Sequence, residues 1–390
     1  MENGVVIVGM ARTPMGGMQG VFTSVPAPKL GAAAIKAALE RGGVKPDAVD
    51  ETIMGCVLPA GLGQAPARQA SIDAGLPLGV GCTTINKMCG SGMKAVMQGF
   101  DAIVAGSSNV VVAGGMESMT NAPYLLPKVR GGLRLGHGEV LDHMFFDGLE
   151  DAYERGRLMG TYAEDCARKY TFSRQAQDEY AITSLTRAQE AIKSGAFKAE
   201  IVPVTLKDGT VVDTDEQPGK AKLDKIPQLK PAFAKDGTVT AANSSSISDG
   251  AAAVILTSAA HAQTLGLKPQ ARILAHSTHA QEPGWFTTAP VSAIQKLMKK
   301  VGWSVADVDL FEVNEAFAVV AMAAMKELSI PHEKLNVRGG ACALGHPVGA
   351  SGARIIVTLC HALRDKGLKR GIASLCIGGG EATAVAIELL

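Results

Sequence analysis

Four short segments of this chain carry side chains that together could perform acyl transfer. They are residues 86–92 (Asn-Lys-Met-Cys-Gly-Ser-Gly), 314–318 (Asn-Glu-Ala-Phe-Ala), 345–352 (Gly-His-Pro-Val-Gly-Ala-Ser-Gly) and 376–380 (Cys-Ile-Gly-Gly-Gly). They supply two thiols, an imidazole, a side-chain amide and backbone N–H groups that glycine leaves accessible. Thioester chemistry needs this set, because a thiol attacks the carbonyl carbon while N–H donors stabilise the oxyanion. One such segment is weak evidence, but four in one chain favour a single acyl-transfer site.

Each of these residues also has an ordinary structural interpretation when it is taken alone. A lone cysteine such as Cys89 or Cys376 is most often a buried small hydrophobe. His346 could be a loop histidine that bonds backbone groups, and Asn314 could cap a helix. Cys89, however, stands where a turn enters a predicted helix. The helix dipole and a neighbouring imidazole there are expected to lower the pKa of the thiol and favour the thiolate.

The elements that position these residues must come from about two domains or a fused pair, since the chain has 390 residues. The net charge is +1 and no basic block appears, which argues against a nucleic-acid partner. The seven cysteines are scattered without metal-ligand spacing, and neither a signal peptide nor an apolar run of membrane-spanning length appears. We therefore expect a cytoplasmic protein with free thiols, no metal and no membrane contact.

A weak internal repeat indicates how the chain is organised. The matched segments are 42–51 with 302–311, 89–92 with 349–352, 110–115 with 374–379, and 5–8 with 271–275. The first two pairs share an offset of 349 − 89 = 260. Each half reads as strand, helix, strand, Gly-rich turn, helix and strand. This alternation predicts a mostly parallel, helix-covered sheet in each half.

Helix and strand signals place the motifs on this scaffold. The predicted helices cover residues 30–41, 91–105, 173–194 and 351–366, and the predicted strands include 110–112 and 372–375. Residues 117–247 are richer in charge and proline, and they are too many for a linker, so we expect an inserted lid. The predicted domains are 1–116 completed by 248–268, the inserted lid domain 117–247, and the second half 269–390.

At these motifs the chain resembles the thiolases, which comprise acetyl-CoA acetyltransferases and 3-ketoacyl-CoA thiolases. The resemblance covers essentially the whole length. It includes residues 114–119 (Gly-Gly-Met-Glu-Ser-Met) and 249–253 (Asp-Gly-Ala-Ala-Ala) as well as the four segments above. It implies an α/β fold of duplicated αβαβα layers, with two similar halves and an inserted lid.

The resemblance also implies a role for each site residue. Cys89 would carry the acyl group as a thioester, and His346 would take its proton and return it to the leaving CoA. Cys376 would be the base at the α-carbon of the second acetyl thioester. Asn314 would hold a water that stabilises the enolate together with His346. The backbone N–H groups of Cys89 and Gly378 would form a second oxyanion hole. Glu315 could be structural or could orient His346.

Further positions match family slots that contact coenzyme A. They are Leu158, Met159, Lys220, Phe233, Ala241, Ser245, Ala316 and Phe317. Core packing is the alternative for Phe233, Ala241 and Phe317, and ordinary solvation is the alternative for Lys220 and its neighbour Lys222.

The chain departs from the family pattern at several of these slots. Leu158 stands where many members have a histidine, and Gly219 where many have an arginine that meets the CoA phosphates. Pro218 occupies the slot of a tyrosine that holds potassium in some members, so we expect no metal site. The bulky pair Trp285-Phe286 suggests a short acyl pocket.

These features favour an acetyl-CoA C-acetyltransferase that condenses two acetyl-CoA molecules reversibly by ping-pong transfer. The alternatives are a longer-chain 3-ketoacyl-CoA thiolase and a non-catalytic acyl-CoA-binding protein. A β-ketoacyl synthase would need a second histidine where this chain has Asn314 and Cys376, and the dinucleotide-binding glycine pattern is absent. We expect CoA thioesters as substrates, no cofactor, and a homodimer or homotetramer joined through residues 120–145.

Overall fold

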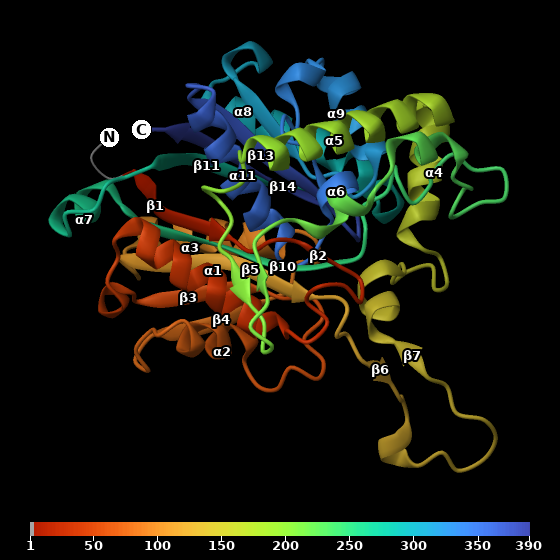
Figure 1. Ribbon diagram of the computed structural model, residues 1–390, viewed down its shortest axis with the longest axis horizontal. Helices are drawn as coiled ribbons and strands as arrows, with labels where there is room; N and C mark the ends of the chain where they lie inside the picture. The colour runs from red at the N-terminus through yellow and green to blue at the C-terminus, as the bar shows by residue number, and fades with distance from the viewer. Residues whose placement is uncertain (1–3) are drawn as a thin grey trace.

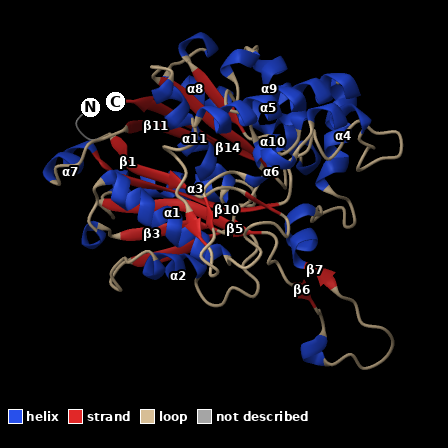
Figure 2. Cartoon of the chain, viewed as in Figure 1, coloured by secondary structure: helices blue, strands red, loops and turns tan. Residues whose placement is uncertain are grey.

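A computed structural model describes residues 4–390, and its centre is a ten-stranded sheet (Figures 1 and 2). The strand order is β12-β13-β14-β11-β1-β10-β5-β3-β4, and β2 pairs with β10. The strands are β1 (Val5–Arg12), β2 (Gly16–Gly17), β3 (Glu51–Gly55), β4 (Gly81–Ile85), β5 (Val110–Ser118), β10 (Ser248–Ser258), β11 (Ala271–Ala280), β12 (Leu310–Val313), β13 (Arg370–Ile377) and β14 (Glu381–Leu389).

The two halves of this sheet repeat the same pairing. In the first half β1 pairs with β10, and in the second half β11 pairs with β14 in the equivalent way. The two halves join where β1 pairs with β11 over three residue pairs. The register of β1 against β10 shifts between Ile7 and Gly9. The register of β11 against β14 shifts in the same way between Ile273 and Ala275. This offset of 273 − 7 = 266 is that of segments 5–8 and 271–275, so their predicted match is confirmed.

The predicted match between residues 110–115 and 374–379 is wrong by four residues. Asp50 accepts backbone N–H bonds from Asn109 and Val110, and Asp309 accepts them from Lys369 and Arg370. Val110 therefore corresponds to Arg370, at the offset of 260 found elsewhere. The glycines misled the alignment, because Gly114 and Gly115 lie inside β5 whereas residues 378–380 form the turn into β14.

The prediction of mostly parallel sheets is also wrong. Strands β3, β4 and β5 run parallel to one another, as do β12 and β13. The pairs β1–β10, β10–β5, β11–β14 and β13–β14 are antiparallel. The reason is local for β14, since a three-residue turn after β13 can only form a hairpin. Strand β10 instead enters between β1 and β5 after the long insertion.

Helices cover both outer faces and fill the space between the two halves. Val110 and Val112 of β5 pack in a core with the outer helix α1, whereas Val111 and Ala113 pack in the central core with α3 and α11. This alternation is the period-two pattern of a strand buried on both faces. The helices around the sheet are α1 (Ala27–Gly42), α2 (Pro66–Asp73), α3 (Ser91–Ala105), α7 (Ala259–Thr264), α8 (Ala289–Val301), α9 (Ala318–Leu328), α10 (Ala341–Leu344) and α11 (Ser351–Asp365).

The predicted helices are present with small shifts at their ends. Helix α3 spans the predicted residues, α11 ends one residue early, and α1 begins three residues early with a proline in its first turn. The predicted helix at 173–194 is α5 (Arg174–Ser194), and the hydroxyl of Ser173 accepts the Ala176 N–H at 3.1 Å. It ends at Gly195 in the left-handed region (φ 77°), a conformation that glycine adopts without strain.

Residues 119–247 form a separate layer over one side of the molecule. They contain β6 (Tyr124–Leu125), β7 (Leu141–Asp142), α4 (Met159–Tyr170), α5, β8 (Val204–Thr205), β9 (Val211–Val212) and α6 (Glu216–Lys220). Figure 1 shows the segment around β6 and β7 as an arm that projects away from the body. Within residues 4–390, no helix is long and apolar enough to cross a membrane.

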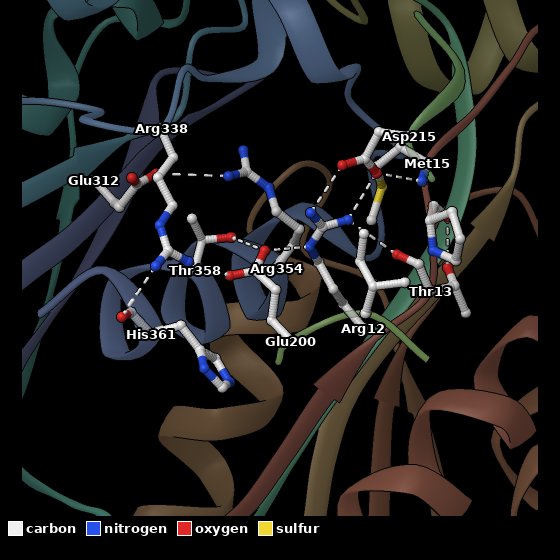
Figure 3. A network of polar contacts seen from close by, with 12 residues as sticks. Arg12, Thr13, Met15, Glu200, Asp215, Glu312, Arg338, Arg354, Thr358 and His361 are labelled. Carbon is white, nitrogen blue, oxygen red and sulfur yellow. Dashed lines mark hydrogen bonds and ion pairs between the residues drawn. The ribbon is translucent and has the colours of Figure 1, made fainter. Parts of the chain in front are cut away.

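A buried network of charges fastens this insertion to both halves (Figure 3). Glu200 of the insertion accepts hydrogen bonds from Arg12 of β1 at 2.5 Å and from Arg338 at 3.1 Å. Asp215 accepts two bonds from Arg12, at 2.7 and 2.9 Å, and one from the Met15 N–H at 2.8 Å. Paired and hydrogen-bonded charges can be buried where single ones cannot, so removing one member would weaken the attachment of the insertion.

Candidate active site

The nucleophile candidate lies in a tight turn immediately before α3. The Met88 N–H donates to Asn86 Oδ1 at 2.9 Å, and Met88 has a positive φ of 47°. The Ser91 hydroxyl accepts the Lys87 N–H at 2.8 Å and donates to the Met88 carbonyl at 2.6 Å. A methionine in the left-handed region is strained, so its surroundings must hold it. The result is a fixed position for the Cys89 thiol.

The starts of α3 and α11 touch each other through glycine. A Cβ on Gly92 would lie 2.9 Å from the Ala353 nitrogen and 3.0 Å from the Gly349 carbonyl oxygen. A Cβ on Gly352 would in turn overlap Met93. Only glycine permits this approach of two backbones. The turn that carries Cys89 therefore lies against the loop that carries His346.

His346 is buried and its ring is held in one tautomer. Its Nδ1 lies 2.5 Å from the Ser351 hydroxyl, which donates its own proton to the Pro347 carbonyl at 3.0 Å. The hydroxyl oxygen must therefore accept from Nδ1–H, which leaves Nε2 with a lone pair. Burial lowers the pKa of His346 to about 3, and the charge of Arg354 adds to the effect. The imidazole is thus neutral near pH 7 and can accept a proton at Nε2.

Asn314 follows β12 and stands between His346 and a buried arginine. Its Nδ2 lies 3.5 Å from the imidazole nitrogens, and its Oδ1 accepts from Arg354 Nη2 at 3.5 Å. Arg354 Nη1 also faces Glu312 at 3.5 Å. Since an arginine can only donate, its position turns the amide oxygen away from the imidazole and the amide N–H₂ toward it. The predicted helix cap is not observed, because α9 begins four residues later.

The second thiol lies beside the first. Cys376, near the end of β13, is fully buried, and burial together with the neighbouring Cys89 raises its pKa. Burial likewise raises the pKa of Cys89 to about 11, although the Gly378 N–H bonds its sulfur and acts in the opposite direction. The prediction of a lowered pKa for Cys89 is therefore wrong, because desolvation outweighs the helix terminus. A base must take the proton when the thiol attacks.

Glu117 is a buried site residue that the motif analysis missed. Its carboxylate accepts N–H bonds from Val57 at 2.9 Å, Leu58 at 3.1 Å and Gly349 at 2.9 Å. Burial raises its pKa to about 7 against the effect of these bonds. Glu117 belongs to the Gly-Gly-Met-Glu-Ser-Met segment. This segment matched the family in sequence, but no function was assigned to its residues. Its contacts tie the loop after His346 to the end of β5.

Glu315 has a structural role. Its carboxylate accepts bonds from Tyr180 at 2.9 Å, Ser184 at 2.8 Å and Asn336 at 2.8 Å, and from the Cys342 N–H at 3.1 Å. Tyr180 and Ser184 belong to α5 of the insertion. Of its two predicted interpretations, the structure favours the one in which Glu315 anchors the insertion to the second half.

Several predicted CoA-contact residues gather at the side of the two thiols. The Ser245 N–H donates to the Ala316 carbonyl at 2.9 Å, and the rings of Phe233 and Phe317 meet edge to face with centroids 6.0 Å apart. The sulfur of Met159 lies against the Gly378 turn, 3.6 Å from where a Cβ on Gly378 would be. These residues place apolar surface next to the backbone N–H of Gly378.

A cavity of about 240 Å³ opens between the insertion and this region. Ala241, Lys222 and Lys225 are among its lining residues. Lys220 is not among them and pairs with Glu216. Leu158 precedes α4 as its N-cap residue. The two lysines at the cavity are thus better placed than Lys220 to meet an anionic group there.

Comparison with known proteins agrees with this geometry. A sequence model described as the N-terminal domain of thiolase matches residues 5–260, and one described as the C-terminal domain of thiolase matches residues 267–389. The chain belongs to the thiolase family. This confirms the predicted family and the duplicated α/β fold. It also confirms the prediction that the protein is an acyltransferase.

Relatives match this thiolase over nearly its whole length. A probable acetyl-CoA acetyltransferase of Dictyostelium discoideum is 51% identical and covers 99% of this chain and 94% of the relative. The acetyl-CoA acetyltransferase of Cupriavidus necator is 50% identical and covers 98% and 99%. Among solved structures, the Bacillus anthracis acetyl-CoA acetyltransferase superposes with a TM-score of 0.97 at 43% identity, over 100% and 99% of the two chains. A thiolase from Ascaris suum in complex with coenzyme A gives 0.94 at 45%, over 99% and 100%.

Proposed function

We propose that this thiolase is an acetyl-CoA C-acetyltransferase, which reversibly condenses two acetyl-CoA molecules into acetoacetyl-CoA and CoA. The observation that supports the proposal is that the thiols of Cys89 and Cys376 adjoin each other beside Gly378, while the start of α3 packs against the loop that carries the neutral His346. One thiol is needed to hold an acyl group and the other to move a proton on carbon. Relatives named acetyl-CoA acetyltransferases, about half identical over their whole length, support the acetyl substrate.

In the first half-reaction the Cys89 sulfur attacks the carbonyl carbon of acetyl-CoA. His346 Nε2 accepts the thiol proton, and the raised pKa of Cys89 explains why attack and proton transfer must be coupled. The Cys89 and Gly378 N–H groups stabilise the oxyanion. The bond from carbon to the CoA sulfur then breaks, and CoA leaves with the proton that His346 held.

In the second half-reaction Cys376 accepts a proton from the α-carbon of the second acetyl-CoA. The water that Asn314 would hold donates one hydrogen to the enolate oxygen and the other to Nε2 of the neutral His346, and this arrangement stabilises the enolate. The enolate carbon attacks the acyl carbon, the bond to the Cys89 sulfur breaks, and the proton on Cys376 passes to Cys89. In the reverse direction Cys376 protonates the carbanion, and its raised pKa keeps that proton available. These groups supply all the chemistry, so the proposal includes no cofactor and no metal.

The pantetheine arm of CoA would follow the apolar surface formed by Met159, Phe233, Ala316 and Phe317, with Ser245 beside it. The phosphates would meet Lys222 and Lys225 at the mouth of the cavity. An ammonium group offers a point charge rather than the two-pronged contact of arginine. We therefore expect the contact with the phosphates to depend strongly on ionic strength.

The proposal is tested by the intact mass of the protein after incubation with acetyl-CoA, followed by thiolysis assays on 3-ketoacyl-CoA substrates of increasing length. We expect one acetyl group per chain and the highest kcat/KM with acetoacetyl-CoA. An adduct combined with higher kcat/KM on long chains would identify a degradative thiolase instead. Absence of any adduct would contradict transfer through a thiol.

We also propose a homotetramer in a reducing compartment such as the cytoplasm. The arm around β6 and β7 exposes Tyr124, Leu126, Leu133, Leu135 and Val140, and Leu135 is 98% exposed. Apolar side chains gathered on one projecting segment are typical of a subunit contact. The edge strand β4 offers a second contact, and the seven cysteines are free thiols. Light scattering that gives the mass of a monomer would contradict the tetramer.

A further inference from the structure

An ion pair that the proposed mechanism does not use joins the two halves next to the reacting sulfurs. Lys87, two residues before Cys89, pairs through Nζ with the carboxylate of Glu381, the first residue of β14. The partners are 294 positions apart, and their side chains are 23% and 33% exposed. A partly exposed pair contributes little to overall stability, so its location at the site is the more informative property.

The same hairpin touches the nucleophile turn at a second point. Ile377 and Glu381 face each other across β13 and β14 and bracket the turn that contains Gly378. The Ile377 side chain packs so closely on Gly90 that a Cβ on this glycine would overlap it. One contact is thus apolar and the other ionic. In the nucleophile turn, Cys89 lies between the contact residues Lys87 and Gly90. In the hairpin, Gly378 lies between the contact residues Ile377 and Glu381.

The middle of the turn is loosely packed, because a Cβ on Gly379 would meet nothing within 4 Å and one on Gly378 would meet only Met159. Its last two glycines have positive φ values of 91° and 87°, and glycine keeps more backbone freedom than any other residue. The Gly380 carbonyl accepts the Gln281 N–H at 2.8 Å, and the Gly378 N–H lies at the Cys89 sulfur. The Gly378 N–H must nevertheless lie within tenths of an ångström of its place to stabilise an oxyanion. The two contacts with the nucleophile turn can supply that constraint.

We propose that the Lys87–Glu381 ion pair is a positioning device, which holds the Gly378 N–H against Cys89. The assignment rests on the proposed function, because it is there that Gly378 stabilises the acyl oxyanion. Lys87 acts through Glu381 and the backbone of the turn rather than through its own charge on the sulfur. The groups that set the pKa of Cys89 are its burial, the backbone N–H groups and Glu117.

The test compares Lys87→Met, Glu381→Gln and the charge swap Lys87→Glu/Glu381→Lys. Glu388→Gln is the matched control, since Glu388 lies at the far end of the same hairpin and pairs with Arg370 at 3.5 Å with similar exposure. We would measure kcat and KM for thiolysis, and the pH dependence of alkylation of Cys89 by iodoacetamide. Loss of the ion pair should lower kcat about 10-fold to 100-fold with little change in KM.

The alkylation profile separates positioning from simple stabilisation. A looser Gly378 N–H stabilises the thiolate less, so the profile of both single variants should move to higher pH, and the swap should restore most of the wild-type kcat and profile. Unchanged profiles with a lower thermal midpoint would overturn the proposal, as would a swap no better than the single variants. If wild-type protein forms no acetyl adduct, the proposed function fails, while the alkylation profiles still test whether the pair positions the turn.

Discussion

Helices α3 and α11 come from the two copies of the repeat and begin at equivalent residues, Ser91 and Ser351, yet they differ in their surroundings. Every residue of α11 from Ser351 to Leu363 is buried, whereas α3 becomes exposed toward its end. Helix α11 is covered by α3 and by strands of both halves, and Glu200 of the insertion adds a bond from its Thr358 at 3.1 Å. The two copies therefore differ in how completely the fold encloses them.

The side chains follow this difference in burial. Arg354 and Thr358 of α11 lie in the buried polar region that anchors the insertion (Figure 3). Their equivalents at the offset of 260 are Lys94 and Gln98, both only half-buried. The halves have also divided the chemistry, because Cys89 precedes the open helix of the first half while His346, Asn314 and Cys376 all belong to the second half. The copy that no longer faces solvent could acquire the groups that need a dry, fixed environment.

The largest effect is expected at position 89, whose equivalent in the second half is Gly349. Cys89→Ala should abolish the acetyl adduct and lower thiolysis at least about 10⁴-fold, because no other group can hold the acyl chain. Intact mass and steady-state kinetics measure this. Cys82→Ala, at a half-buried free thiol on β4 of the same half, should behave like wild type. Equal losses in both variants would show that the effect is not specific to position 89.

A second substitution separates the contributions of the two halves. Cys376→Ser should lower condensation about 10³-fold, because a hydroxyl is a far weaker proton carrier than a thiol. The acetyl adduct on Cys89 should still form, since the first half-reaction uses only His346. Burst measurement of CoA release, compared with steady-state formation of acetoacetyl-CoA, tests the division. Loss of the burst would mean that both halves act in both steps.

A matched pair of substitutions tests the difference in burial directly. Arg354→Met should lower the free energy of unfolding by about 1–3 kcal/mol, because it leaves the Glu312 carboxyl, whose pKa burial raises to about 8, without its partner. Lys94→Met at the equivalent site should change it by less than about 0.5 kcal/mol. Urea denaturation of both variants measures the comparison. Similar values would contradict the conclusion that the two helices differ in burial.

A smaller effect is expected from pH. Burial lowers the pKa of His361 on α11 to about 4, whereas an unfolded histidine titrates near its ordinary value of about 6.5. The unfolded chain therefore binds more protons between these values. Stability should fall as the pH drops through this window, with about 2–3 kcal/mol from this residue. His361→Asn should flatten the dependence of urea midpoint on pH.

Short sequence patterns were sufficient to predict the main helices and the family. The start of α3 at Ser91 and the cap of α5 at Ser173 were predicted correctly, because glycine entries and hydroxyl caps act over a few residues. The alignment of residues 110–115 was wrong because glycine has different uses inside a strand and in a turn. The parallel sheet was wrong because nothing local shows where β10 would enter.

The remaining site features depend on partners that are distant in sequence. Lys87 and Glu381 are 294 positions apart, and no pattern in either neighbourhood indicates the other. The pKa of Cys89 was mispredicted for a related reason. The helix terminus is visible in the sequence, but the burial that outweighs it arises only in the folded chain, where Ile377 of the hairpin and Met144 of the insertion pack beside the turn of Cys89. Burial and long-range pairing are properties of the folded chain.

The position of β10 also has a consequence for protein synthesis. Strand β10 separates β1 from β5, but it begins at Ser248, which is 248 − 118 = 130 residues after β5 ends. At a translation rate of about 5–20 residues per second, the ribosome needs roughly 6–25 s to supply it. Until then β1 and β5, both apolar on both faces, have unpaired edges on the nascent chain. A chaperone that binds extended apolar segments would have its main period of action in this interval.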